Sequence, residues 1–219
     1  MKREESDPVV AIDGPAGSGK STTARALARC LGWTYLDTGA IYRTLGWLAV
    51  QEGVSLDDED VLVALCPRLD ALSFRWGEDG LLSVFLGDVD VTQAIRGEEA
   101  GRWASDVSRH PRVRKALLDL QRSFVRRGPL VIEGRDTGTV VFPKARWKFH
   151  LTASLEERAR RRLREMGLEE TPENLEKVKG AIRERDLQDA TRPVAPLRRA
   201  EDAVEVDTTD LSPEEVVNL

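Results

Sequence analysis

A segment near the start of the chain has the residue types and spacing of a loop that binds polyphosphate. An apolar run, residues 9–12, precedes the pattern G-x-x-x-x-G-K-[ST], which begins at Gly14. In such a loop the glycines let backbone N–H groups point at phosphate oxygens, Lys20 adds positive charge on the outer phosphates, and Ser21 supplies a hydroxyl for Mg²⁺. The alternative is a glycine-rich turn that matches by chance. The residues expected to hold the triphosphate are Gly14, Pro15, Ala16, Gly17, Ser18, Gly19, Lys20, Ser21 and Thr22.

A second polar segment, residues 37–43, follows the next apolar run. It contains a hydroxyl at Thr38, small residues and Arg43, which together suit a second ligand placed beside the phosphates. The same residues also suit a helix N-terminus with Asp37 or Thr38 as its cap. Both interpretations stay open on the sequence alone.

A third segment, residues 133–138, reads Glu-Gly-Arg-Asp-Thr-Gly. The two glycines permit close backbone approach, Arg135 is able to fork onto a phosphate, and Asp136 is able to accept from a sugar or nucleobase donor or to orient a Mg²⁺-bound water. An ordinary turn with an ion pair between Arg135 and Asp136 is the alternative.

Arg185, Asp189 and Arg192 recur at a spacing that places them on one face of a helix ending before Pro193. An acid between two arginines suits a ligand that offers both phosphate and hydroxyl groups, whereas the alternative is a solvated face of ion pairs. A denser arginine run precedes them, and we expect at most one or two of its members to reach ATP. The run consists of Arg158, Arg160, Arg161, Arg162 and Arg164.

The elements that position these residues form an α/β fold. Short continuous apolar runs predict a five-stranded parallel sheet covered on both faces, with strands at residues 9–12, 34–36, 130–132, 148–151 and 203–206. Ligands of such sheets bind at the carboxyl ends of the strands. The polar residues that follow the runs are Asp13, Asp37, Glu133, Thr152 and Asp207.

Two regions interrupt the alternation of strands and helices. Residues 67–96 contain strand-like runs at 72–76 and 81–86 joined by a turn at 77–80, which predicts a small antiparallel insertion. Residues 160–192 are charged and helical with a break at 167–172, and the spacing Ser154-x-x-Glu157 predicts a capping box at their entry. We expect this arginine-rich helical pair to form a lid, and the first eight residues to form a frayed tail.

Composition excludes several classes of protein. The chain has 219 residues, two cysteines and two histidines, and Cys30 and Cys66 have no metal-ligand spacing. It shows neither a signal peptide nor an apolar stretch of membrane-spanning length, so we expect a cytoplasmic protein without membrane partners. The net charge of -5 argues against a general nucleic-acid binder.

Five segments together resemble bacterial cytidylate kinases, in order and over nearly the whole chain. They are the phosphate-binding loop, L-D-T-G-A-I-Y-R at 36–43, P-R-V-R at 111–114, E-G-R-D-T-G-T-V-V-F-P at 133–143 and I-R-E-R-D-L-Q-D-A-T-R-P-V-A-P-L at 182–197. The resemblance implies a P-loop NTPase core and transfer of phosphate from ATP, with Mg²⁺, to CMP or dCMP. Apart from the resemblance, we expect a monomer that binds small nucleotides and no nucleic acid. The corresponding division is core at 1–66, NMP-binding insertion at 67–96, core at 97–159, lid and acceptor-binding helix at 160–192, and core at 193–219.

The resemblance also implies roles for single residues. The family's cytosine-facing positions correspond to Thr38, Arg114 and Asp136; its ribose-facing positions to Ser105, Arg185 and Asp189; and its CMP-phosphate positions to Arg43, Arg135 and Arg192. Lys20 and Arg161 match positions that serve the transferring phosphoryl group, so the residues expected to act in catalysis are Lys20, Arg135, Arg161 and Arg192. Family members usually continue beyond the helix that begins near Ser212, so we expect a C-terminal helix that is either short or truncated here.

Other functions remain as alternatives to this interpretation. A P-loop kinase acting on UMP, AMP or a non-nucleotide acceptor would share most of these features, and a panel of substrates separates it. A GTPase or nucleotide switch would need a guanine-reading N-K-x-D motif, which the sequence lacks. Such a switch would also leave the arginines of the second site unexplained, and a pure binding module is the least favoured alternative.

Overall fold

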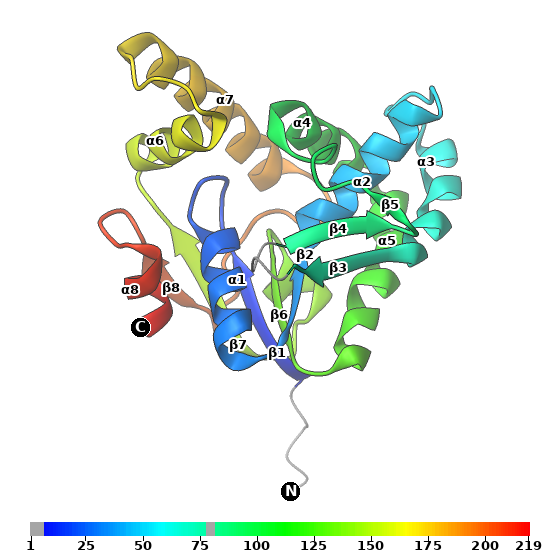
Figure 1. Ribbon diagram of the computed structural model, residues 1–219, viewed down its shortest axis with the longest axis horizontal. Helices are drawn as coiled ribbons and strands as arrows, with labels where there is room; N and C mark the ends of the chain where they lie inside the picture. Colours follow the sequence, from blue (N-terminus) through cyan, green and yellow to red (C-terminus); the bar gives the residue numbers. More distant parts are fainter. Residues whose placement is uncertain (1–6, 78–81) are drawn as a thin grey trace, which may run out of the picture. The chain divides into compact units, whose positions relative to one another are not determined.

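A computed structural model describes residues 7–77 and 82–219 of the chain (Figure 1). It divides into two compact units. The first combines the residues up to Tyr35 with Val125–Leu219, and the second is Leu36–Phe124. The insertion expected at 67–96 therefore lies within a larger unit that extends on both sides of it.

A five-stranded sheet forms the centre of the first unit, with the last two residues of its strand β2 counted in the second. Its strand order is β2-β6-β1-β7-β8, and β1 pairs in parallel with both β6 and β7, as β7 does with β8. The bounds are β1 (Asp7–Asp13), β2 (Thr34–Asp37), β6 (Leu130–Gly134), β7 (Ala145–Thr152) and β8 (Val204–Asp207). All five expected strands and the fold class are confirmed. Because β1 begins at Asp7, the expectation of a frayed tail is wrong for residues 7 and 8, while residues 1–6 lie outside the described part.

The strands form where the sequence predicts because their apolar runs are buried. Leu130, Val131 and Ile132 have no exposed surface, and Ile12 is 1% exposed. Each such side chain contributes roughly 1.5–3 kcal/mol relative to an exposed one. This burial fixes the sheet and, with it, the loops at the carboxyl ends of the strands.

Helix α1 (Lys20–Leu31) follows the phosphate-binding loop directly and ends at Gly32, whose φ of 65° is left-handed. In Figure 1 it lies beside the C-terminal helix α8 (Pro213–Asn218), with which it is in contact. Helices α6 (Leu155–Met166) and α7 (Pro172–Thr191) pack together through Ala159, Leu163, Val178 and Ile182. The expected break between them is therefore confirmed.

The expected capping box at the start of α6 is only half formed. Ser154 accepts from the backbone N–H of Glu157, but the Ser154 N–H donates to the hydroxyl of Thr209 instead. The carboxylate of Glu157 accepts from Arg161 and Arg164. Because its carboxylate binds these two arginines of the following turns, Glu157 does not accept from the Ser154 N–H as a capping box requires.

The second unit combines helices with a three-stranded sheet of order β3-β4-β5. The antiparallel pair β3–β4 was expected, the third strand was not, and positions 78–81 of the expected turn and second run lie outside the described residues. Helices α2 and α4 approach closely at Gly46, where an added Cβ would lie 2.4 Å from the Cβ of Trp103. The elements are α2 (Thr38–Gln51), α3 (Glu59–Leu65), η1 (Cys66–Ala71), β3 (Leu72–Trp76), β4 (Leu82–Leu86), β5 (Val89–Asp90), α4 (Gly97–Ser108) and α5 (Pro111–Ser123).

None of the helices in the described part of the chain combines the length and the apolar character needed to cross a membrane.

Candidate active site

The phosphate-binding loop has a backbone that only glycine accommodates at several positions. Gly14, Gly17 and Gly19 have φ angles of 157°, 76° and 83°. A Cβ on Gly14 would lie 2.2 Å from the carbonyl oxygen of Leu151, and one on Gly17 would lie 3.0 Å from that of Arg158. The glycines thus allow the loop to pack tightly between β7 and α6.

The groups inside this loop fit a polyphosphate and a magnesium ion. The hydroxyl of Ser18 is buried and makes no hydrogen bond with the rest of the described chain, and Lys20, 7% exposed, donates to the carbonyl of Pro15 at 3.1 Å. Ser21 lies partly buried in the first turn of α1, whose N-terminus favours an anion. Mg²⁺ is coordinated by oxygen atoms, and most of them usually come from water and substrate phosphates. One protein hydroxyl beside bound phosphates, that of Ser21, therefore suits the ion.

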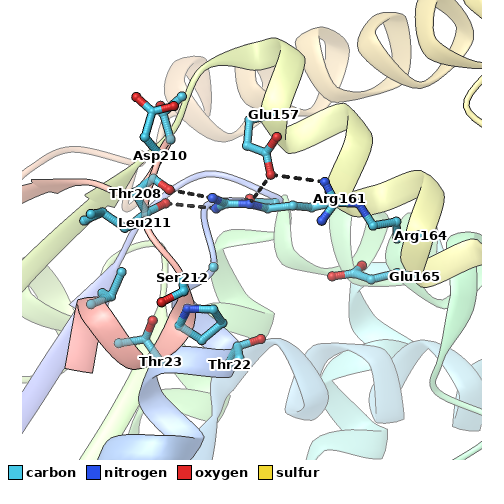
Figure 2. Close-up of a pocket in the computed structure, with 15 residues that line it drawn as sticks. Thr22, Thr23, Glu157, Arg161, Arg164, Glu165, Thr208, Asp210, Leu211 and Ser212 are labelled. Carbon is cyan, nitrogen blue, oxygen red and sulfur yellow. Dashed lines mark hydrogen bonds and ion pairs between the residues drawn. The ribbon is translucent and has the colours of Figure 1, made fainter. Parts of the chain in front are cut away.

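A pocket of about 470 Å³ opens beside the loop (Figure 2). Its walls come from α1, α6 and residues 208–213, and Arg161 extends across it. The Arg161 guanidinium donates to the hydroxyl of Thr208 at 2.9 Å and to the Glu157 carboxylate at 3.0 Å. The Thr208 hydroxyl lies 3.0 Å from the carbonyl oxygen of Ser18, so it connects Arg161 to the phosphate-binding loop. Thr208 is not among the residues expected from the sequence.

Two members of the arginine run reach the phosphate-binding loop. Arg161 is the expected one; the second is Arg158, for which the sequence indicated no particular role and which is 8% exposed. Arg158 donates to the carbonyl of Ala16 at 3.2 Å and pairs with Asp186 of α7 at 2.7 Å. The other three, Arg160, Arg162 and Arg164, pair with glutamates near the surface.

Four expected acceptor-site residues form one alternating line of charge in the first unit. Arg135 pairs with Asp189 at 2.7 Å, Asp189 with Arg192 at 3.5 Å, and Arg192 with Asp136 at 3.4 Å. Their side chains are between 8% and 16% exposed, so a solvated helix face is excluded for Asp189 and Arg192. The pairs connect β6's loop to α7, and the alternative of a local pair between Arg135 and Asp136 is not observed.

This line keeps the carboxylate of Asp189 charged. Burial by itself would raise the pKa of Asp189, but the charge of Arg135 and its hydrogen bond, with the charge of Arg192, hold that pKa below its usual range. Arg185, on the same helix, lowers it further. Asp189 is therefore an acceptor near neutral pH, and it is suited to hydroxyl donors.

The second unit, taken by itself, holds the remaining expected residues. Asp37 caps α2 by accepting from the N–H of Ala40 at 3.1 Å, which confirms the capping interpretation for Asp37, and it also pairs with Arg43 at 2.5 Å. Thr38 is the buried first residue of that helix. Ser105 lies in α4, where its hydroxyl donates to the Gly101 carbonyl at 3.3 Å.

Arg114 is buried in helix α5 of this unit, at 7% exposure. Its guanidinium carbon lies 5.4 Å from the ring centroid of Tyr42, a distance at which a cation is attracted to the ring face. A buried arginine held against a ring is suited to reading a planar polar group.

Comparison with known proteins shows the family to which the chain belongs. A family model described as cytidylate kinase matches residues 10–219. A cytidylate kinase of Methylococcus capsulatus is 48% identical over 216 residues, which cover 99% of this chain and 96% of that protein. One from a Geobacillus species is 47% identical over 209 residues, covering 95% and 92%. Among solved structures, an uncharacterized protein from Eubacterium ventriosum matches with a TM-score of 0.50 and 8% sequence identity. The match covers 96% of this chain and 93% of that protein, and it shows a similarity of fold only. The chain therefore belongs to the cytidylate kinase family, whose members are nucleoside monophosphate kinases.

Proposed function

We propose that this protein performs the reaction of its family, the transfer of the γ-phosphoryl group of ATP to CMP or dCMP, through the residues of the two units described above. The observation that carries the substrate class is the identity of nearly half of all residues, over nearly the full chain, to proteins named cytidylate kinase. The buried line of alternating arginines and aspartates supports an acceptor that offers phosphate and hydroxyl groups together.

The donor side of the proposal uses the phosphate-binding loop and the adjoining pocket. Backbone N–H groups within residues 14–22, except at Pro15, and the ammonium group of Lys20 bind the phosphates of ATP, and the pocket crossed by Arg161 takes the nucleoside part. Ser21 holds the magnesium ion. Bound Mg²⁺ neutralises part of the negative charge on the outer phosphate oxygens.

The acceptor side of the proposal distributes nine residues over the parts of CMP. Asp189, kept anionic by its arginine neighbours, accepts from ribose hydroxyls, while the guanidinium groups fork onto the phosphate. The assignments are Thr38, Arg114 and Asp136 for cytosine, Ser105, Arg185 and Asp189 for ribose, and Arg43, Arg135 and Arg192 for phosphate.

The chemistry requires positioning more than proton transfer. A phosphate monoester has a second pKa of about 6, so the acceptor is already mostly dianionic at neutral pH and no general base is needed. Catalysis then depends on aligning two anionic nucleotides and on compensating charge at the transferring group. Lys20 and Arg161 supply that positive charge from the donor side, and Arg135 and Arg192 supply it from the acceptor side.

The proposal also covers the roles of the insertion and the lid, the oligomeric state and the cellular location of the protein. The insertion at 67–96 belongs to the acceptor-binding part, and helices α6 and α7 act as a lid that brings arginines to the phosphates and excludes water. All assigned residues come from one chain, which suits a monomer, and the free nucleotide substrates suit a cytoplasmic enzyme.

A panel of acceptors tests the proposed function. With ATP and Mg²⁺, release of ADP is expected with CMP and dCMP, at efficiencies well above those for UMP and AMP. Comparable kcat/KM for UMP or AMP would contradict the assignment to cytidine nucleotides. No release with any nucleoside monophosphate, by a folded protein that binds ATP, would contradict the kinase function itself.

Substitutions on α7 separate the phosphate-facing and sugar-facing roles. Arg192→Met is expected to lower kcat/KM for CMP and dCMP alike by about tenfold to a hundredfold, because it removes a charge-assisted contact worth about 1.5–3 kcal/mol. Asp189→Ala and Arg185→Met are expected to change the ratio of CMP to dCMP as well, since they contact hydroxyls. Steady-state kinetics with both acceptors measure the ratio.

The matched control for this series is Arg183→Met, an exposed arginine of the same helix. It is expected to change both kcat/KM values by less than about twofold. If the three variants behave like the control, α7 does not bind the acceptor.

A further inference from the structure

The last residue of β1, Asp13, makes three hydrogen bonds that the proposed mechanism does not use. Its Oδ1 accepts from the backbone N–H of Thr137 and from the Thr137 hydroxyl, both at 2.8 Å, and its Oδ2 accepts from the backbone N–H of Gly138 at 2.8 Å. Thr137 and Gly138 begin a single helical turn, η3 (Thr137–Val141). A carboxylate from one strand therefore binds the start of a turn that follows another strand.

The residues immediately before this turn belong to the proposed acceptor site. Asp136 has φ −145° and ψ 23°, which is neither helical nor extended, and its side chain faces Arg192. Arg135, one residue earlier, pairs with Asp189. The three hydrogen bonds at Thr137 and Gly138 fix the path of the chain directly after these two side chains.

Asp13 also directly precedes the phosphate-binding loop, because Gly14 is the next residue. One carboxylate thus ties the beginning of the donor loop to the loop that carries Arg135 and Asp136. Among the described residues, no other side chain is shown accepting from both Thr137 and Gly138.

Holding a charge at this position is costly for the fold. Burial raises the pKa of Asp13 above its ordinary value, and the charge of the nearby Asp136 carboxylate adds to the rise. The hydrogen bonds from the N–H groups of Gly138 and Thr137 lower this pKa in part, and the result is a pKa of about 6. Asparagine has nearly the same shape, but only one of its two side-chain termini accepts. Its NH₂ group would face either the Gly138 N–H or the Thr137 donors, so only a carboxylate satisfies all three.

We propose that Asp13 is a positioning residue for the phosphoryl acceptor, holding the loop of residues 135–138 so that Arg135 and Asp136 meet CMP in the geometry that transfer requires. This inference rests on the proposed function of that loop. Asp13 itself touches neither substrate. Its loss therefore acts through the placement of the two side chains that precede Thr137.

The test is a pair of isosteric substitutions, Asp13→Asn and Thr137→Val, assayed with CMP, dCMP and ATP. Asp13→Asn is expected to raise KM for CMP by about tenfold or more and to lower kcat, since it removes an acceptor of a charge-assisted hydrogen bond, while KM for ATP changes by less than about threefold. Thr137→Val removes only the hydroxyl donor and is expected to shift KM for CMP in the same direction by a smaller factor. Thermal melting, recorded for each variant, confirms that the assayed protein is folded.

A matched control makes the same chemical change at a carboxylate with a similar contact elsewhere. Asp58 accepts from the N–H of Val61 at the start of α3, and Asp58→Asn is expected to leave both KM values unchanged. The double variant Asp13→Asn with Thr137→Val is expected to lose less than the product of the two single losses, because both changes break one shared contact.

Three outcomes would overturn the inference. The first is unchanged kinetics in folded Asp13→Asn, or in Thr137→Val if Asp13→Asn does not fold. The second is an equal increase of KM for CMP and for ATP. The third is a loss in the double variant that equals the product of the two single losses. A purely structural role predicts lower melting temperatures with unchanged KM values. Failure of the unmodified protein to phosphorylate CMP would instead overturn the proposed function, and this inference with it.

Discussion

Replacing Lys20 by alanine is expected to reduce phosphoryl transfer from ATP to CMP by about a thousandfold or more, the scale on which preorganised charge at a transferring phosphoryl group acts. Lys20 is buried in the phosphate-binding loop, and its ammonium group donates to the carbonyl of Pro15. The loop thus helps to hold the side chain in place. Coupled release of ADP, measured under saturating substrates, gives the change in kcat.

The fold is expected to survive this substitution, since Lys20 lies in the ligand-binding loop and not in the apolar core. Lys177→Ala, at an exposed position of α7, is the matched control and is expected to retain full turnover. Both variants are melted alongside the unmodified protein. Near-normal turnover by Lys20→Ala, with a normal melting curve, would contradict the assignment of residues 14–22 as the donor site.

Arg114→Met is expected to remove most of the preference for CMP over UMP. Cytosine presents an N3 acceptor and an amine donor, so a donor such as Arg114 and an acceptor such as Asp136 complement it, whereas uracil leaves both unpaired. Sites built on buried polar groups discriminate by about 10⁴ or more in kcat/KM. Because Arg114 is 7% exposed, little water is available to replace the lost partner.

Arg112→Met is the matched control for this prediction. Arg112 lies two positions away on the same helix, is largely exposed and pairs with Asp60. Its loss is expected to leave the ratio of kcat/KM for CMP and UMP within about twofold of the original. Equal ratios in the Arg114→Met variant and the unmodified enzyme would show that another group reads the base.

The strands and the phosphate-binding loop could be predicted because each leaves a local signal in the sequence. Strands such as β6 are continuous apolar runs since both of their faces are buried, and the glycine spacing of the loop follows from its backbone. The break between α6 and α7 is likewise local: Gly167 ends one helix, and Thr171 caps the next.

The pairings within the site could not be predicted in this way. Arg135 and its partner Asp189 are 54 residues apart in sequence, and no local pattern selects that pair over the adjacent Asp136. In the sequence, Arg158 looks the same as the neighbouring arginines that lie at the surface. It is buried because α6 packs against the phosphate-binding loop, where Arg158 contacts Ala16. Strand β5 has two residues, too few to show an alternation.

In the proposed acceptor site, the alternating line from Arg135 to Asp136 would favour whole nucleotides over free phosphate. Each guanidinium is already paired with a carboxylate, so a free inorganic phosphate that bound there would compete with Asp189 and Asp136 and could offer them only its own P–OH groups. A nucleoside monophosphate brings hydroxyl and amine donors along with its phosphate, and thereby replaces both members of each pair. We therefore expect inorganic phosphate and pyrophosphate to bind this arginine-rich site more weakly than a nucleoside monophosphate does.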